Sequence, residues 1–140
     1  MKIPVLFLLV CFTCVSSAFG QDVVGRWKTI DDETGNPKSI VEIFEKGGKV
    51  YGKVVKLFRT PEEDPDPVCD ECDEADDRYK KKVIGMEIMR DMTRGEGGAW
   101  SGGEILDPKN GKVYNCRIWL EGDDLKVRGY WGRSTGLKPG

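Results

Sequence analysis

Short segments of alternating apolar and polar residues run along the chain from residue 23 onward, separated by glycine, proline, asparagine and aspartate. Alternation with a period of two is typical of strands with one buried face, and the separating residues are typical of turns. The alternation is clearest late in the chain, where Tyr114, Cys116, Ile118 and Leu120 fall on one face of a strand. No stretch keeps a period of 3.6 residues, so the pattern predicts an all-β protein.

The pattern predicts seven short strands, over residues 23–30, 39–44, 50–58, 83–89, 99–106, 113–120 and 125–131. In the fourth of these, we expect Ile84, Met86 and Ile88 to share one face. The turn formers Gly47-Gly48 and Asn110-Gly111 lie between neighbouring strands and indicate hairpins. Glycines inside the strands indicate bends where a sheet curls. The prediction is an antiparallel meander barrel of seven to eight strands, with a β-sandwich as the main alternative.

The first twenty residues have a different pattern. Lys2 is followed by an apolar run over residues 5–12 and by small residues that end at Gly20. This order is typical of a secretory signal peptide, so residues 1–20 are expected to be removed before Gln21. Residues 21–140 then form a single barrel domain in the periplasm or outside the cell. The apolar run is too short for a membrane anchor and no second run follows it, so no membrane span is expected.

Composition excludes several classes of function. The 140 residues contain 24 acids, 22 bases and no histidine. Without Lys2 the balance is 24 acids against 21 bases, or −3, so binding to nucleic acid is not expected. The absence of histidine excludes histidine-dependent triads and histidine-ligated metals. Three cysteines remain after the leader and fall short of a structural zinc site, so we expect neither a metal nor a cofactor.

Two carboxylates, Glu104 and Asp107, lie on neighbouring elements, as in a glycosidase pair. Asp107, however, precedes Pro108 at the start of a turn, where an aspartate normally accepts hydrogen bonds from backbone amides. The chain also has no nucleophile motif and no phosphate-binding glycine loop. We therefore expect no enzymatic activity.

Ten acids and no base occupy residues 62–77. Carboxylates are the ligands that calcium prefers, but the spacing fits no EF-hand loop and no glycine turns the chain around an ion. A solvated, mobile acidic loop is the favoured interpretation.

A Cys-x-x-Cys motif, Cys69 to Cys72, lies inside this acidic segment. Asp70 and Glu71 disfavour thiolate formation, so a resting Cys69–Cys72 disulfide is expected rather than a redox centre. Cys116 is then a buried free thiol. The alternative joins Cys116 to one of the two loop cysteines.

The motif Gly25-x-Trp27 resembles the Gly-x-Trp motif of the calycins, the lipocalin and fatty-acid-binding barrels. More specifically, the chain resembles an uncharacterised family of secreted bacterial proteins, domain of unknown function 2147 (DUF2147). The matching stretches are Gly25-x-Trp27 with Asp31-Asp32, Ser39-Ile40-Val41-Glu42-Ile43, Gly52-Lys53, Cys69-x-x-Cys72, Gly102-Gly103-Glu104-Ile105-Leu106-Asp107-Pro108, Gly111-Lys112-x-Tyr114-x-Cys116 and Leu125-Lys126-Val127-Arg128-Gly129-Tyr130. The resemblance implies a calycin-like fold and an envelope location, without a known activity. Family members usually continue into an aromatic, arginine-containing tail, so a short or missing closing strand is expected here.

The calycin resemblance implies a structural role for Trp27, which would plug the closed end of the barrel. Arg128 is the expected partner, with its guanidinium packed across the indole ring.

The leading hypothesis for function is a monomeric barrel that binds an apolar or amphipathic small molecule, with Trp100, Tyr114 and Trp131 lining the site. The alternative is a solid barrel that serves as a structural or interaction module and contacts another envelope protein. A thiol–disulfide protein acting through Cys69 and Cys72 is the least favoured hypothesis.

Overall fold

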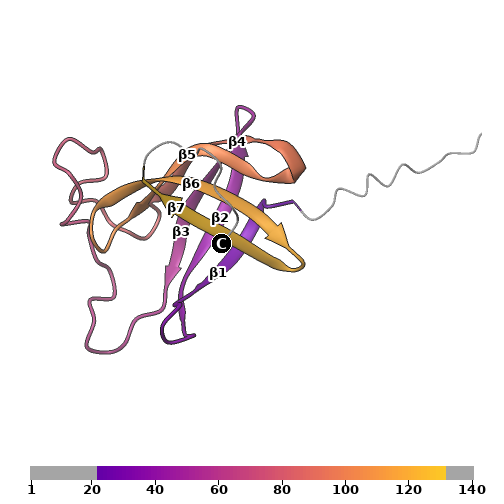
Figure 1. Cartoon of the computed structure of the whole chain (residues 1–140). Helices are drawn as coiled ribbons and strands as arrows, with labels where there is room; N and C mark the ends of the chain where they lie inside the picture. The colour runs from indigo at the N-terminus through magenta and orange to yellow at the C-terminus, as the bar shows by residue number, and fades with distance from the viewer. Residues whose placement is uncertain (1–21, 132–140) are drawn as a thin grey trace, which may run out of the picture.

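A computed structural model describes residues 22–131, which form one antiparallel sheet in sequence order (Figure 1). The predicted leader, residues 1–20, lies outside the described residues. The strands are β1 (Gly25–Ile30), β2 (Pro37–Lys46), β3 (Lys49–Leu57), β4 (Glu87–Arg94), β5 (Trp100–Asp107), β6 (Lys112–Glu121) and β7 (Asp124–Tyr130). Each strand pairs with its neighbours in the chain, so the predicted meander is confirmed.

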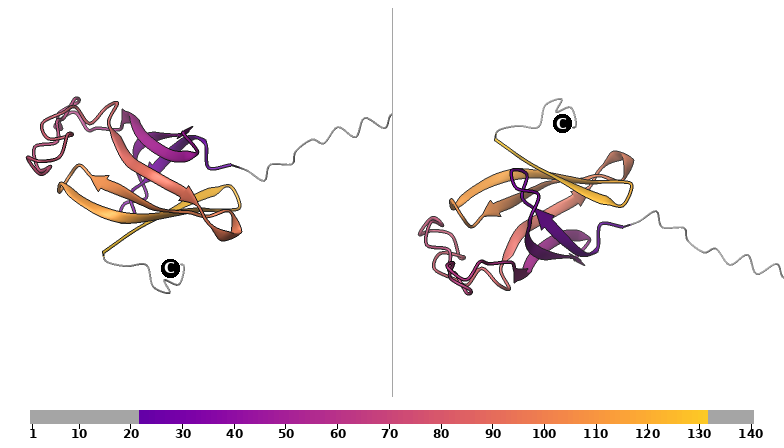
Figure 2. Two further views of the ribbon diagram at one scale, coloured as in Figure 1. Left: turned by 90° about the horizontal axis from the view of Figure 1, so that it is seen from above. Right: turned by 90° about the horizontal axis from the view of Figure 1, so that it is seen from below.

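The sheet curls on itself into a nearly closed barrel. Seen from above and from below, β1–β3 lie on one side and β5–β7 on the other (Figure 2). β1 and β7 are the two ends of the strand order, and within residues 22–131 they do not pair with each other. We call the gap between them the seam.

Alternation along the strands builds a packed core inside the barrel. Cys116 and Ile118 on β6 are fully buried, as the sequence pattern predicts for that face. They pack together with residues from the segment before β1 and from β2 to β5. This core comprises Val23, Val41, Ile43, Val50, Met89, Met92, Trp100, Cys116 and Ile118.

Close approach of two strands explains a glycine within β5. A Cβ atom at Gly103 would collide with the backbone of Arg90 and Asp91 on β4. Any larger residue would push the two strands apart, so this glycine permits the curl that the sequence pattern indicates.

The prediction of the fourth strand over residues 83–89 is wrong at both ends. Residues 83–86 form a turn, in which the Met86 amide donates to the Val83 carbonyl at 3.1 Å. The strand begins at Glu87 and continues to Arg94, with Met89 and Met92 buried. Asp91 has a φ of 61° and lies where the β3–β4 register shifts. This irregularity interrupts the alternation and hides the strand from a periodicity analysis.

The long β3–β4 connection is packed against the barrel rather than fully solvated, which corrects the expectation for the acidic loop. Cys69 and Cys72 form a second apolar cluster with Met86 and with Leu106 of β5. Leu106 pairs with Val113 of β6, and both lie on the opposite sheet face from Ile105 and Tyr114. The residues before Pro67 in the acidic segment are exposed, as expected.

Within the described residues, the one helical element is the 3₁₀ helix η1 (Glu96–Gly98). No helix in this part of the chain has the length and apolarity needed to cross a membrane.

Candidate functional site

An open cleft of about 650 Å³ extends from the seam between β1 and β7 to the inward-facing side chains of the barrel, and we call this space the cavity. One side of its mouth is formed by residues 28–30 of β1 and by Asp32 in the turn after it. The other side is formed by residues 123–127 at the start of β7. Exposed apolar side chains flank this mouth, because Ile30 is 50% exposed and Val127 is 48% exposed. The cavity is therefore accessible from outside without movement of a strand.

The walls of the cavity are apolar because the register turns apolar side chains inward at this level of the barrel. Trp27 is aligned with Val41 across β1 and β2, and Leu125 is aligned with Leu120 across β6 and β7. The deeper lining consists of Trp27, Val41, Ile43, Met89, Ile105 and Leu125.

The wall also contains the hydroxyl group of Thr29, which forms a hydrogen bond within the protein. It lies 2.6 Å from the Ser39 hydroxyl on β2. Its own hydrogen-bonding capacity is thus partly satisfied by the protein, and the wall favours an apolar occupant.

Charged residues surround the mouth. Lys28 and Lys126 come from β1 and β7, and the carboxylates come from the two adjacent turns, at Asp32, Asp123 and Asp124. An apolar interior with a charged rim suits a molecule that has an apolar body and a polar end.

Trp27 contacts the packed core and also lines the cavity. Its side chain is half-buried and packs against the core cluster. The indole Nε1 donates a hydrogen bond to the Val23 carbonyl oxygen at 2.7 Å. The ring is therefore held in a defined orientation, with one part in the core and another lining the cavity. The barrel-plug role stays a prediction.

Arg128, the predicted partner of Trp27, lies on β7. Arg128 is aligned with Arg117 across β6 and β7. Both lie on the sheet face opposite to Leu125 and Val127, whereas Trp27 is aligned with the inward-facing Val41. Stacking between Arg128 and Trp27 stays a prediction.

The three aromatic residues predicted to bind a ligand lie elsewhere than in the lining of this cavity. Trp100 is 6% exposed and belongs to the packed core. Tyr114 and Trp131 contact each other, with ring centroids 4.8 Å apart, and Trp131 is 67% exposed. Their ligand-binding role stays a prediction.

The sequence pattern does not predict which residues line the cavity. Alternation indicates the face of the sheet on which a residue lies, but not its height along the barrel. The available signal was the Gly-x-Trp motif, which includes Trp27. The residues opposite it on β2, Val41 and Ile43, follow once the β1–β2 hairpin is placed in register.

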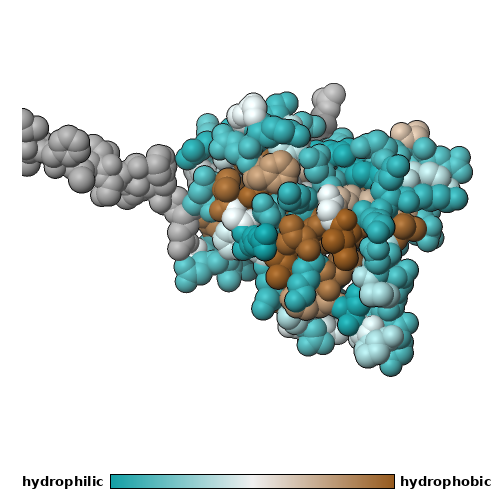
Figure 3. All heavy atoms as spheres, turned by 180° about the vertical axis from the view of Figure 1, so that it is seen from behind, coloured by the Kyte–Doolittle hydropathy of each residue, from teal (hydrophilic) through white to brown (hydrophobic). Residues whose placement is uncertain are grey.

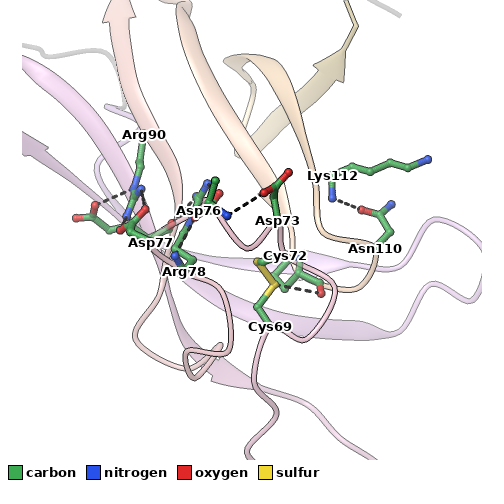
Figure 4. Close-up of polar contacts among 12 residues, drawn as sticks. Cys69, Cys72, Asp73, Asp76, Asp77, Arg78, Arg90, Asn110 and Lys112 are labelled. Atoms are coloured by element: carbon green, nitrogen blue, oxygen red, sulfur yellow. Dashed lines mark hydrogen bonds and ion pairs between the residues drawn. A yellow bond between two sulfur atoms is a disulfide. The ribbon is translucent and has the colours of Figure 1, made fainter.

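The structure joins Cys69 to Cys72 in a disulfide and leaves Cys116 as a buried free thiol (Figure 4). Both expectations are confirmed. Burial raises the pKa of the Cys116 thiol to about 12, so this group stays neutral and behaves as a small apolar residue. Cys69 and Cys72 are themselves buried, which limits access of an external thiol and weakens the thiol–disulfide hypothesis.

Carboxylates of the acidic segment are engaged by arginines (Figure 4). The Arg78 side chain is buried and donates to both Asp76 oxygens at 2.8 and 2.9 Å and to the Glu87 carbonyl at 3.0 Å. Arg90 makes a two-pronged contact with Asp77 at 2.8 and 2.9 Å. The hydrogen bonds from Arg78 hold the pKa of Asp76 far below its usual range.

Among residues 22–131, no group of three or more potential metal ligands is placed so that it could hold a metal ion.

The Asp107 carboxylate serves the β5–β6 turn. Its Oδ1 accepts a hydrogen bond from the Lys109 amide at 2.9 Å. This is the role in turn formation that the sequence predicts, in place of a partnership with Glu104 in catalysis.

Comparison with known proteins identifies the family. The model of the family described as "Uncharacterized protein conserved in bacteria (DUF2147)" matches residues 25–138. The chain belongs to the DUF2147 family. A search of curated proteins finds no match for this DUF2147 protein.

The DUF2147 chain is also similar to a solved structure, protein HP1028 from the human pathogen Helicobacter pylori, described as belonging to the lipocalin family. The TM-score is 0.68, the identity is 16%, and the match covers 83% of this chain and 77% of HP1028. At this identity the likeness shows the fold alone. The predicted lipocalin-like barrel is confirmed.

Proposed function

We propose that this DUF2147 protein binds an apolar or amphipathic small molecule inside its barrel. The observation that carries the proposal is the cavity of about 650 Å³, which has apolar walls and an opening at the seam. Its volume falls within the range of small-molecule sites, roughly 300–1,000 Å³.

The proposed action is non-covalent binding in the periplasm or outside the cell. The location is supported by the leader-like pattern of residues 1–20.

Titration with a fluorescent apolar probe, anilinonaphthalene sulfonate, tests the proposal. Val127→Trp places a large side chain at the mouth, and the half-exposed position tolerates the change. Val24→Trp is the matched control, because Val24 is similarly exposed but lies outside the cavity lining. We expect saturable binding to the wild-type protein and about tenfold weaker binding to Val127→Trp, a change of ~1.4 kcal/mol. Equal affinity of the two variants, or no saturable binding to the wild type, contradicts the proposal.

A further inference from the structure

The outer face of β1–β3 carries lysine side chains placed over aromatic rings. We call this the lysine–aromatic face. The ammonium group of Lys53 lies 5.5 Å from the centre of the Phe44 ring. Lys28 and Lys56 both approach Phe58, at 5.9 and 4.9 Å. The contacts extend along the strands, because Phe44 also stacks on Tyr51, with ring centroids 5.8 Å apart.

The positive charges of these lysines are not neutralised by a neighbouring carboxylate. Within residues 22–131, the ammonium groups of Lys28, Lys53 and Lys56 make no ion pair with a carboxylate. A ring contact attracts a cation but carries no negative charge, so each lysine can still attract an anion.

The acids on this face already have partners. Glu42 pairs with Arg26 at 3.4 Å, and Glu87 pairs with Lys46 at 3.7 Å. The Tyr51 hydroxyl donates to Asp91 at 2.9 Å. With five bases against these three acids, the face is positive on a chain whose formal net charge is −2.

Hydrophobic side chains gather on the same face. Figure 3 shows them over the outer side of β2 and β3, surrounded by hydrophilic residues. Half-buried outward-facing residues of these strands include Ile40, Phe44 and Val55. Cationic groups around an apolar centre match the boundary of a bilayer, where phosphate groups lie above acyl chains.

The lysine–aromatic face continues into the mouth of the cavity. Lys28 belongs to both, because its ammonium group lies over Phe58 while the residue also lines the mouth. Ile30, two residues further on the same side of β1, is exposed at the mouth. The acidic segment packs against Leu106 of β5, against Gly111 in the β5–β6 turn and against Arg90 of β4.

We infer that the lysine–aromatic face docks onto an anionic lipid surface. Docking in this orientation would bring the seam next to the lipid, so that an apolar molecule could exchange with the cavity without passing through bulk water. The docking itself does not require a ligand in the cavity, whereas the exchange rests on the proposed function.

Vesicle co-sedimentation tests the docking. The probes are vesicles of phosphatidylcholine containing phosphatidylglycerol, with vesicles of phosphatidylcholine alone for comparison. The wild-type protein is expected to bind the anionic vesicles and to be released by salt. Lys53→Gln with Lys56→Gln should weaken binding roughly 25-fold, or about fivefold per lysine, which corresponds to ~1 kcal/mol each.

Lys109→Gln with Lys112→Gln is the matched control, because it makes the same charge change at the exposed β5–β6 turn. It should weaken binding by less than about threefold, since these lysines lie outside the face.

Three results would overturn the docking inference: no preference for anionic vesicles, equal weakening by both double variants, or a salt-sensitive dimer that forms through the same lysines and binds no vesicles. Titration of both double variants with anilinonaphthalene sulfonate separates this inference from the proposed function. Unchanged probe binding with weakened vesicle binding is the expected combination. Vesicle binding without any probe binding would leave the docking inference standing and reject the ligand-binding proposal.

Discussion

At the residue scale, the Asp76–Arg78 pair makes stability depend on pH. The folded-state pKa of Asp76 is lowered by the hydrogen bonds from Arg78, from an ordinary value of 3.8. The pair therefore stabilises the fold fully at pH values well above 3.8, and this stabilisation is lost as the pH falls towards the folded-state pKa. Denaturation of the wild type should show a steep loss of stability in this acidic range.

Asp76→Asn should lower the free energy of unfolding by about 2 kcal/mol at neutral pH, because it leaves the buried guanidinium without its charged partner. The variant should also lose less stability than the wild type on acidification. Glu74→Gln is the control, since Glu74 is an exposed acid of the same segment. Chemical denaturation at neutral and acidic pH measures both effects. Parallel pH curves for the wild type and Asp76→Asn would contradict this explanation.

Trp27 combines apolar packing with one hydrogen bond, and two substitutions separate them. Trp27→Ala should cost at least about 3 kcal/mol of unfolding free energy, in the range of large aromatic truncations. Trp27→Phe keeps much of the apolar ring but removes the donor to Val23, so it should cost about 1 kcal/mol. A loss near zero for Trp27→Ala in chemical denaturation would reject the structural role.

At the element scale, Gly111 allows the disulfide loop to lie directly on the β5–β6 turn. Its φ is +73°, and a Cβ atom there would overlap the backbone of Glu71 and Cys72. Gly111→Ala should displace the loop and speed reduction of the Cys69–Cys72 disulfide by a phosphine about tenfold, which corresponds to ~1.4 kcal/mol of lost protection.

Gly122→Ala is the control for backbone strain. Gly122 also has a positive φ, of +59°, but nothing lies within 4 Å of the added Cβ atom. Equal reduction rates in the two variants would show that the contact with the loop does not protect the disulfide.

The elements that follow a regular period could be predicted from sequence, and those fixed by contacts between distant segments could not. The face carrying Cys116 and Ile118 follows from alternation, and the Asp107 turn follows from the local preference of Asp-Pro. In contrast, the start of β4 depends on an irregularity at Asp91 that breaks the period. Docking of the acidic segment depends on Leu106, an apolar residue on the outer face whose partners Cys69 and Cys72 lie far earlier in the chain.

At the scale of the whole molecule, the sequence predicts the barrel and the family but not the position of the cavity. Aromatic residues on inward faces were expected to line it, yet Trp100 fills the packed core and Trp131 is exposed. The position of the cavity follows from how far the sheet curls and from where β1 and β7 separate. Both are properties of all seven strands together, and no local pattern encodes them.

The central claim, that the barrel holds a small molecule, is tested most directly by native mass spectrometry of the full chain purified from its own host. The claim predicts one stoichiometric extra mass that disappears when the protein is denatured. The extra mass should be reduced in Val127→Trp and retained in Val24→Trp. Repeated absence of an extra mass from the wild-type protein, or its equal retention in both variants, would contradict the claim.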